Sequence, residues 1–229
     1  MKADYKVAKV LGSGCFANVH EVVPSGAEGT RKSKAIKIGY SEKLKSEMDI
    51  YPYLKDIPFY SRYVKGFVPN GTLREVLSGI LFRKMEVSLS RACGTLPFPK
   101  ALLISEQLAR QLNEIHERGI AHGDVRLDNI MHHKKYGYQF IDFGNAHIKE
   151  KESEASFKYD LNQDIASLFQ VIRCILANDL TNPTLFSYFK KHPGLKEQVE
   201  ELIKPCPLAV FITKVEAFKA GHPVLFTEQ

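Results

Sequence analysis

The sequence predicts an α+β fold, in which an antiparallel sheet with one helix is followed by a mainly helical region. Apolar and polar residues alternate through residues 5–39, which is typical of strands with one buried face. Farther along the chain, apolar residues recur at helical spacing through residues 97–118 and 163–176. The 229 residues are enough for one good core or for two small lobes.

Composition and charge indicate an ordinary globular protein. The chain has 44% hydrophobic and 25% charged residues, a net charge of +6 and a pI of about 9.0. Because the basic residues are scattered, we expect no nucleic-acid partner. No apolar run approaches the length of a membrane span and no signal sequence is visible, so we expect no membrane partner and a cytoplasmic location. Four widely spaced cysteines without a metal-binding pattern predict free thiols.

Five strands are expected in the first part of the chain. The alternating pattern and its breaks place three of them at Tyr5–Leu11, Ala17–Val23 and Lys34–Gly39. Tyr60–Pro69 and Gly79–Val87 are expected to complete a five-stranded sheet.

Helix signals are clearest at three places. Ser41–Leu54 begins with a capping residue and carries Leu44, Met48 and Tyr51 at the spacing of an apolar helix face. It also contains Pro52, which is expected to end or kink it. Pro97–Arg118 and Gln163–Leu176 each carry a wide apolar face. Three shorter helical stretches separated by prolines follow up to Gln229, and they offer no chemistry.

A glycine turn joins the first two strands. It contains Gly12, Ser13 and Gly14, and glycines there let the backbone approach a triphosphate closely while their N–H groups face its oxygens. Most such turns are merely tight hairpins, so the pattern alone is weak evidence for a nucleotide site.

The most informative stretch runs from residue 120 to 146. Asp124, Asn129 and Asp142 flank two short apolar segments, Asn129–Met131 and Tyr138–Ile141, that predict a hairpin. A polar loop, a hairpin and a carboxylate at its far end would bring the three side chains into one small volume. Their hard oxygen donors suit Mg²⁺, which takes one or two carboxylates and completes its shell with water and phosphates.

These residues and their spacing resemble the catalytic loop and metal-binding DFG segment of the protein kinase-like superfamily. The resemblance is carried by His122, Gly123, Asp124, Arg126 and Asn129, followed by Asp142-Phe143-Gly144. It implies a two-lobed fold, with an N-lobe over 1–87 and a C-lobe over 88–229. It also implies transfer of a phosphoryl group from ATP, with Mg²⁺ or Mn²⁺, to a Ser/Thr hydroxyl of a protein.

The resemblance assigns roles to individual residues. Asp142 and Asn129 would bind the metal, and Asp124 would accept or orient the proton of the acceptor hydroxyl. Arg126 would stabilise charge on the γ-phosphate. Lys37 would clamp the α- and β-phosphates, with Glu47 as its partner and Glu42 as the alternative partner. The residues expected around the nucleotide are Leu11, Gly12, Ser13, Gly14, Val19, Ala35, Lys37, Glu86, Ser88 and Met131.

Two further residues have expected supporting roles. His122 resembles the packing and hydrogen-bonding histidine of the family, and we do not expect it to act as a base. Asp164 resembles the buried aspartate that holds the kinase catalytic loop from below. The alternative for Asp164 is a favourable interaction with the helix dipole near the start of its helix.

The departures from the family pattern concern regulation and substrate. Gly123 replaces the usual arginine, and the stretch from Gly144 to Asp164 is short and has no APE-like segment. We therefore expect activity without activation-loop phosphorylation and a reduced platform for a peptide substrate. Ser153 and Ser156 are candidate autophosphorylation sites.

The leading interpretation is a minimal, atypical Ser/Thr protein kinase. It is similar to small kinases that bacterial pathogens inject as effectors, which implies a monomer, a host protein such as a chaperone as substrate, and the host cytoplasm as location. The small kinase of the tRNA threonylcarbamoylation complex is also similar, but it normally lacks such a glycine loop. An aminoglycoside- or choline-type kinase is a rival, although Arg126 stands where histidine is usual there. A nucleotide-binding pseudokinase would normally have lost Lys37, Asp124, Asn129 or Asp142.

Overall fold

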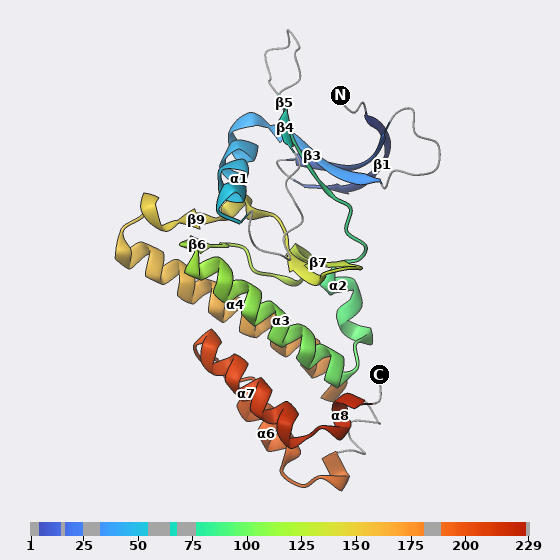
Figure 1. The fold of residues 1–229 in the computed structure, drawn as a ribbon, viewed down its shortest axis with the longest axis vertical. Helices are drawn as coiled ribbons and strands as arrows, with labels where there is room; N and C mark the ends of the chain where they lie inside the picture. Colours follow the sequence, from blue (N-terminus) through green and yellow to red (C-terminus); the bar gives the residue numbers. More distant parts are fainter. Residues whose placement is uncertain are drawn as a thin grey trace. The chain divides into compact units, whose positions relative to one another are not determined.

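The computed structural model describes residues 5–14, 17–24, 33–54, 65–67, 77–180 and 189–227. The chain folds into two compact units. The first comprises Met1–Glu86 together with Asp142–Asn145, and the second comprises Val87–Ile141 together with Ala146–Gln229. The α+β class, with an antiparallel sheet and a mainly helical remainder, is confirmed (Figure 1).

The first unit is built on an antiparallel sheet with strand order β1-β2-β3-β5-β4. The strands are β1 (Tyr5–Ser13), β2 (Ala17–Pro24), β3 (Lys34–Tyr40), β4 (Lys65–Phe67) and β5 (Leu77–Arg83). The last strand ends at Arg83 and does not reach residue 87 as predicted, because residues 84–87 take no ladder partner. Most of the predicted strand over residues 60–69 lies outside the described residues.

Helix α1 (Ser41–Leu54) has the bounds that the sequence predicts. Pro52 lies in its last turn, where a missing N–H and a ring that crowds the preceding turn prevent the helix from continuing far. Leu44, Ile50 and Leu54 are buried on the helix, and Ile80 is buried on β5, which α1 contacts. These apolar contacts hold α1 to the sheet.

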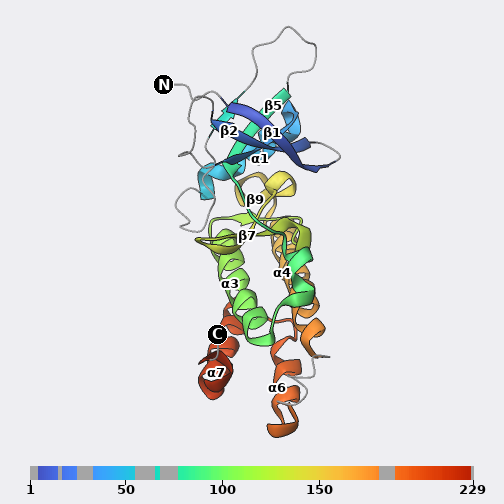
Figure 2. The ribbon, with the colours of Figure 1, turned by 90° about the vertical axis from the view of Figure 1, so that its right-hand side faces the viewer.

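The second unit is organised by two long helices, α3 (Phe98–Glu117) and α4 (Glu154–Leu180), which lie side by side (Figures 1 and 2). The start predicted for the second helix, Gln163, is wrong by nine residues. Only Phe157 is buried before that point, so the first turns of α4 lack the apolar periodicity that marks a helix in a sequence.

Short elements connect these helices. The predicted hairpin is confirmed as β7 (Ile130–His133) paired with β8 (Gly137–Phe140), while β6 (Ile120–Ala121) pairs with β9 (His147–Ile148). The remaining short elements are α2 (Leu89–Ala92), η1 (Cys93–Thr95), η2 (Leu127–Asn129), η3 (Phe143–Asn145) and η4 (Lys149–Lys151). Of these, η3 belongs to the first unit and the others belong to the second.

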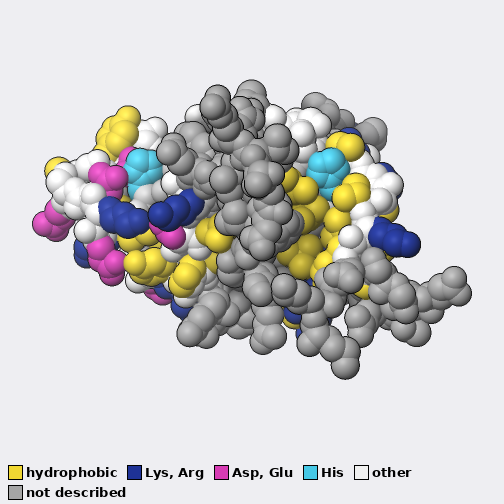
Figure 3. All heavy atoms as spheres, turned by 90° about the horizontal axis from the view of Figure 1, so that it is seen from above, with side chains coloured by type: hydrophobic (Ala, Val, Ile, Leu, Met, Phe, Trp, Pro, Cys, Tyr) yellow, Lys and Arg dark blue, Asp and Glu magenta, His cyan; other side chains and the backbone are white. Residues whose placement is uncertain are grey.

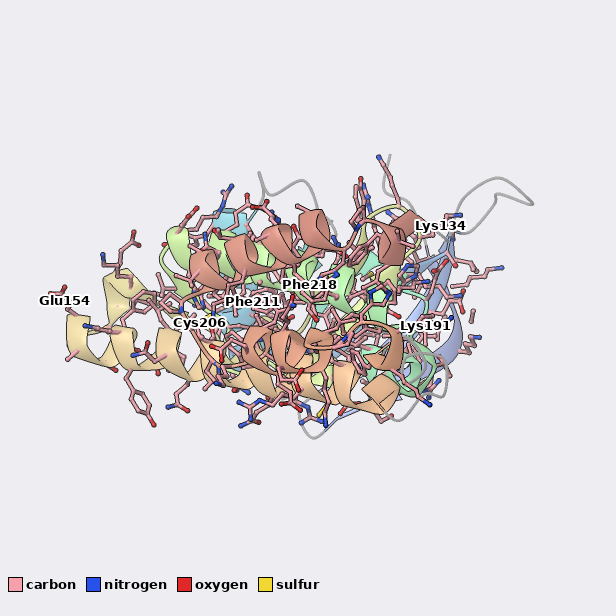
Figure 4. All side chains as sticks on the ribbon, turned by 90° about the horizontal axis from the view of Figure 1, so that it is seen from below. Lys134, Glu154, Lys191, Cys206, Phe211 and Phe218 are labelled. Atoms are coloured by element: carbon pink, nitrogen blue, oxygen red, sulfur yellow. The ribbon has the colours of Figure 1, made fainter. Side chains whose placement is uncertain are left out.

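The C-terminal region contains α6 (Leu195–Leu202), α7 (Leu208–Gly221) and α8 (Val224–Thr227). The rings of Phe211 and Phe218 on α7 (Figure 4) pack edge-on against Phe169 and Phe98, with centroid distances of 5.2 and 6.2 Å. Glu106 on α3 adds an ion pair of 2.7 Å to Lys219. These contacts attach α7 to the paired helices.

One face of the molecule shows charges of both signs. In the view from above, acidic and basic side chains lie among one another on the left of the picture (Figure 3). Among the described residues, no helix is long and apolar enough to cross a membrane. The described cysteines Cys93, Cys174 and Cys206 carry free thiols.

Candidate active site

A cluster of one lysine and two carboxylates lies in the first unit. The Nζ atom of Lys37, on β3, lies 2.7 Å from Glu47 Oε2 on α1 and 2.7 Å from Asp142 Oδ1. Register places Lys37 in the middle of the sheet, between Val19 of β2 and Ile80 of β5. The structure therefore brings together three residues that the sequence separates by as many as 105 positions.

Burial makes the pair between Lys37 and Glu47 electrostatically demanding. Glu47 is 1% exposed, so its charged carboxylate loses the free energy of hydration, and only a close cation can offset that cost. Burial lowers the pKa of Lys37, but the charges of Glu47 and Asp142 outweigh it and the net pKa is raised. For Glu47, burial raises the pKa while Lys37 opposes the shift. Lys37 is therefore held as a cation with its charge directed at the two carboxylates.

Tyr51 is a member of this cluster that sequence analysis treated only as part of an apolar helix face. Its hydroxyl donates a hydrogen bond of 2.7 Å to Glu47 Oε1. The signal that was available is the spacing, since residues four apart on a helix share a face. A tyrosine four residues after a buried glutamate is placed to satisfy its second oxygen.

Asp142 has an unusual backbone conformation. Its φ of 62° is the only positive value for a non-glycine residue in the described part of the chain. Such a conformation costs on the order of 1–3 kcal/mol and persists only where surrounding contacts hold it. Here Gly144 N donates to Asp142 Oδ1 at 3.3 Å, and Lys37 binds the same oxygen. The geometry keeps a partly exposed carboxylate beside Lys37.

The polar loop of the second unit joins Asp124 to Asn129. The side-chain amide Nδ2 of Asn129 donates to the Asp124 backbone oxygen at 3.0 Å and to Asp124 Oδ2 at 2.7 Å. Since both acceptors are oxygens, the NH₂ group of Asn129 must face them, and its Oδ1 points the other way. That oxygen is the atom of Asn129 suited to a cation.

Asp164 anchors this loop, as the sequence predicts. Its carboxylate accepts hydrogen bonds from His122 N at 2.6 Å and Gly123 N at 2.9 Å, and His116 Nε2 lies 3.0 Å away. Asp164 is 2% exposed and lies in the third turn of α4, not near the helix start, so the dipole explanation is wrong. A buried carboxylate with several donors fixes the backbone that precedes Asp124.

His122 is part of the same support and is completely buried. Its Nδ1 accepts a hydrogen bond from Asp124 N at 3.2 Å, so the ring proton must sit on Nε2, which lies 3.1 Å from the Ile141 carbonyl oxygen. With both ring nitrogens engaged to backbone groups, His122 positions the loop.

Arg126 pairs with Asp128 at 2.8 Å, and both side chains are more than half exposed. Hydrogen bonds from Arg126 and Ser90 lower the pKa of Asp128. An exposed pair of this kind contributes only about 0–1 kcal/mol, so Arg126 can exchange this partner for another anion at low cost.

The residues expected around the nucleotide are distributed over both units. Leu11, Gly12 and Ser13 end β1, and the turn closes with Gly14 N donating to Ala17 O at 2.9 Å. In the second unit, Ser88 forms a bridge with Met131 of β7. The others are Val19 on β2, Ala35 and Lys37 on β3, and Glu86 at the end of the first unit's main segment.

Each unit carries an oxygen donor of the kind that Mg²⁺ binds. Within the described residues, no group of three or more His, Cys, Asp or Glu side chains is arranged to hold a metal ion. Mg²⁺ does not need such a group, because it commonly binds one or two protein oxygens and takes the rest from phosphates and water. The Asp142 carboxylate is such a donor in the first unit, and Asn129 Oδ1 is such a donor in the second.

Several known proteins that resemble the chain carry the name of Ser/Thr protein kinases. The chain is 26% identical over 159 residues to the serine/threonine-protein kinase AtPK2/AtPK19 of Arabidopsis thaliana, covering 67% of this chain and 33% of that protein. It is 28% identical over 158 residues to CBL-interacting serine/threonine-protein kinase 7 of the same plant, covering 64% and 35%. It is also 28% identical over 155 residues to the cytokinesis protein sepH of Aspergillus terreus, covering 67% and 11%.

The chain thus matches about a third or less of the length of these relatives. No family model matches it. The distant similarity supports the protein kinase-like superfamily.

Proposed function

We propose that the chain is an active kinase that transfers the γ-phosphoryl group of ATP, with Mg²⁺, to a Ser/Thr hydroxyl of a protein. The observation that carries the proposal is the pair of the partly buried Lys37 with the buried Glu47, with Asp142 at 2.7 Å from the same Nζ atom. A partly buried lysine held by two carboxylates is well suited to accept a polyphosphate in exchange for one of them. The sequence similarity to protein kinases gives independent support.

Four residues would bind or position the nucleotide and its metal ion. The ammonium of Lys37 would bind the α- and β-phosphates, and Glu47 would hold it in place. Asp142 and Asn129 Oδ1 would hold Mg²⁺, which when bound neutralises charge on the phosphates. Positioning and charge neutralisation account for most of catalysis in this reaction.

The loop of the second unit would act on the hydroxyl group that accepts the phosphoryl group. Asp124 Oδ2 is occupied by Asn129, so its Oδ1 is the atom suited to the proton of the acceptor hydroxyl. Arg126 would leave its exposed pair with Asp128 to stabilise charge on the transferring group. Because Asp164 holds the backbone before Asp124, the carboxylate is oriented before any substrate binds.

We also propose that the enzyme is active without phosphorylation. All residues from 146 to 164 are described, and β9, η4 and the start of α4 take up most of them. The N–H of Gly123 already donates to Asp164, so the loop is anchored by a carboxylate of its own unit. A small-molecule acceptor is the second candidate, because this short connection provides no long strand on which an extended peptide could add.

The test compares ADP release and ³²P transfer from ATP and Mg²⁺ by the wild type, Asp142→Asn and the exposed control Glu201→Gln. Each protein is assayed alone, after phosphatase treatment and with a cell lysate. We expect labelled protein bands with the wild type and control that are lost in Asp142→Asn, and the bands would identify the acceptor, including any host protein. ADP release without labelled protein would favour a small-molecule acceptor. Bound nucleotide without turnover would refute the proposed activity and favour a pseudokinase, and loss of activity after phosphatase treatment would refute phosphorylation-independence.

A further inference from the structure

Tyr51 connects three parts of the first unit at one buried point. It lies on α1 and is 5% exposed. Its ring packs edge-on against Phe82 of β5, with centroids 5.6 Å apart, and against Phe143 of η3, with centroids 6.0 Å apart. Its hydroxyl donates to Glu47 Oε1 at 2.7 Å. One side chain therefore contacts the sheet, the segment after Asp142 and the glutamate that pairs with Lys37.

The hydrogen bond from Tyr51 completes the environment of the Glu47 carboxylate. Oε2 is bound by Lys37 and Oε1 by Tyr51, so both oxygens of the planar group have partners on different elements. A carboxylate held at both oxygens cannot rotate about its last side-chain torsion without losing one of them. At 1% exposure, water offers no ready replacement for a lost partner.

The aromatic contacts fix the position of the hydroxyl itself. The rings of Phe82 and Phe143 lie at 63° and 68° to the Tyr51 ring, in the edge-to-face arrangement that aromatic pairs prefer. Phe143 follows Asp142 directly in the sequence. The two phenylalanines thus hold the ring, and the ring holds the oxygen against Glu47.

We infer that Tyr51 is a positioning residue for the proposed phosphoryl transfer, acting through Glu47 to hold the ammonium of Lys37 where it meets the phosphates. The inference rests on the proposed function for its effect on turnover, but the positioning of Lys37 is a property of the folded unit alone. A residue that only packed would act through its ring, whereas this role belongs to the hydroxyl.

The substitution Tyr51→Phe separates the two roles, because it keeps the ring and removes only the oxygen. We expect kcat/KM for ATP to fall about tenfold, which is the usual effect of leaving a buried hydrogen-bonding group without its partner. The urea midpoint should also fall, because the same buried carboxylate loses a partner in the folded state, so kcat/KM is compared without urea, where every variant is folded. The control is Tyr159→Phe, on α4, where the side chain is 63% exposed and no change is expected.

A double-mutant cycle with Glu47→Leu tests the route of the effect. If Tyr51 acts through Glu47, adding Tyr51→Phe to Glu47→Leu should cause no further loss of kcat/KM. Multiplied losses in the double variant would overturn the inference, as would a Tyr51→Phe enzyme with wild-type kcat/KM.

A second readout decides the inference without turnover. The rate at which acetic anhydride acetylates Lys37, followed by mass spectrometry, reports whether Nζ is held by its partners. We expect faster acetylation of Lys37 in Tyr51→Phe than in the wild type and Tyr159→Phe, with Lys9 reacting equally in all three. If the wild type does not turn over ATP, the proposed function fails while this rate still tests Tyr51. Equal rates at Lys37 in all three proteins would overturn the inference.

Discussion

Replacing Lys37 by methionine removes the cation from a carboxylate that cannot reach water. Glu47 is 1% exposed, so in Lys37→Met it is expected to take up a proton rather than remain charged. The usual pKa of this carboxyl is 4.5. Protonating it at pH 7 costs about 2.5 pH units, or about 3.4 kcal/mol, and at pH 5.5 it costs about 1.4 kcal/mol. We therefore expect Lys37→Met to lose about 3 kcal/mol of unfolding free energy at pH 7 and about 1 kcal/mol at pH 5.5.

The direction with pH follows from linkage. In Lys37→Met the folded-state pKa of Glu47 lies above its unfolded value, so the variant has its full relative stability below about pH 4.5. That stability is lost as the pH rises toward the folded-state pKa, and the deficit against the wild type grows accordingly. Urea denaturation of both proteins between pH 5 and pH 8 measures the difference.

Two further variants make this measurement decisive. Lys37→Met combined with Glu47→Leu should recover most of the lost stability, because no carboxylate remains buried without a cation. The pH dependence of the stability deficit should disappear in this double variant. Lys9→Met is the control, since Lys9 is 64% exposed and lies 3.7 Å from Glu21, and it should cost at most about 0.5 kcal/mol. A deficit for Lys37→Met below about 1 kcal/mol at pH 7, with no dependence on pH, would refute the argument.

Three other predictions concern buried or strained groups. Gln139→Leu is expected to raise the unfolding free energy by about 1 kcal/mol, because both amide atoms of Gln139 are buried without a hydrogen-bond partner among the described residues. By contrast, Gln111→Leu should lower the unfolding free energy by about 1–3 kcal/mol, because it removes the hydrogen bond of 2.8 Å to Tyr138 O. Asp164→Asn should lower it by about 2–4 kcal/mol and reduce turnover, because an amide cannot accept from both backbone N–H groups of the loop. Asp142→Asn should be about 1 kcal/mol more stable than Asp142→Ala, because asparagine tolerates the positive φ better, and both should be inactive.

Urea denaturation and ATP turnover check all three predictions. Equal effects of the two glutamine substitutions would show that the buried amide of Gln139 has a partner in solution. A fully active Asp164→Asn would show that the loop keeps its geometry without the carboxylate. Equal stability of the two Asp142 variants would show that the backbone there relaxes away from the left-handed region.

Local sequence signals predicted those parts of the fold in which one strong pattern decides the structure. Helix α1 has the predicted bounds because Pro52 limits its end and an apolar face precedes it. The start of α4 could not be predicted, because its first turns bury only Phe157 and the helix there depends on favourable residues rather than on an apolar face. The end of β5 could not be predicted either, because residues 84–87 continue the alternating pattern beyond the sheet, and Val87 O accepts from His132 N of β7 rather than from a sheet strand.

For the candidate site, residue type and spacing predicted side chains of suitable chemistry. Asp164 was correctly expected to hold the loop, although its place in α4 was misjudged. Tyr51 was missed because a tyrosine at helical spacing is counted as an apolar residue, and its hydroxyl becomes informative only once Glu47 is known to be buried. The positive φ of Asp142 leaves no trace in the sequence, since the residue type that adopts it is common elsewhere.

Each unit stabilises its own share of the proposed catalytic residues. In the first unit, Tyr51 and Lys37 hold both oxygens of Glu47. In the second, Asp164 holds the backbone before Asp124 by accepting from two N–H groups, one of which belongs to Gly123, at the position where the kinase motif that this loop resembles has an arginine. Because these partners come from the same unit as the groups they hold, the energetic cost of ordering them is met when the unit folds. Phosphorylation of a residue after Asp142 would therefore not be needed to order either Lys37 and Glu47 or the loop before Asp124. This is the physical reason to expect an enzyme that does not depend on phosphorylation.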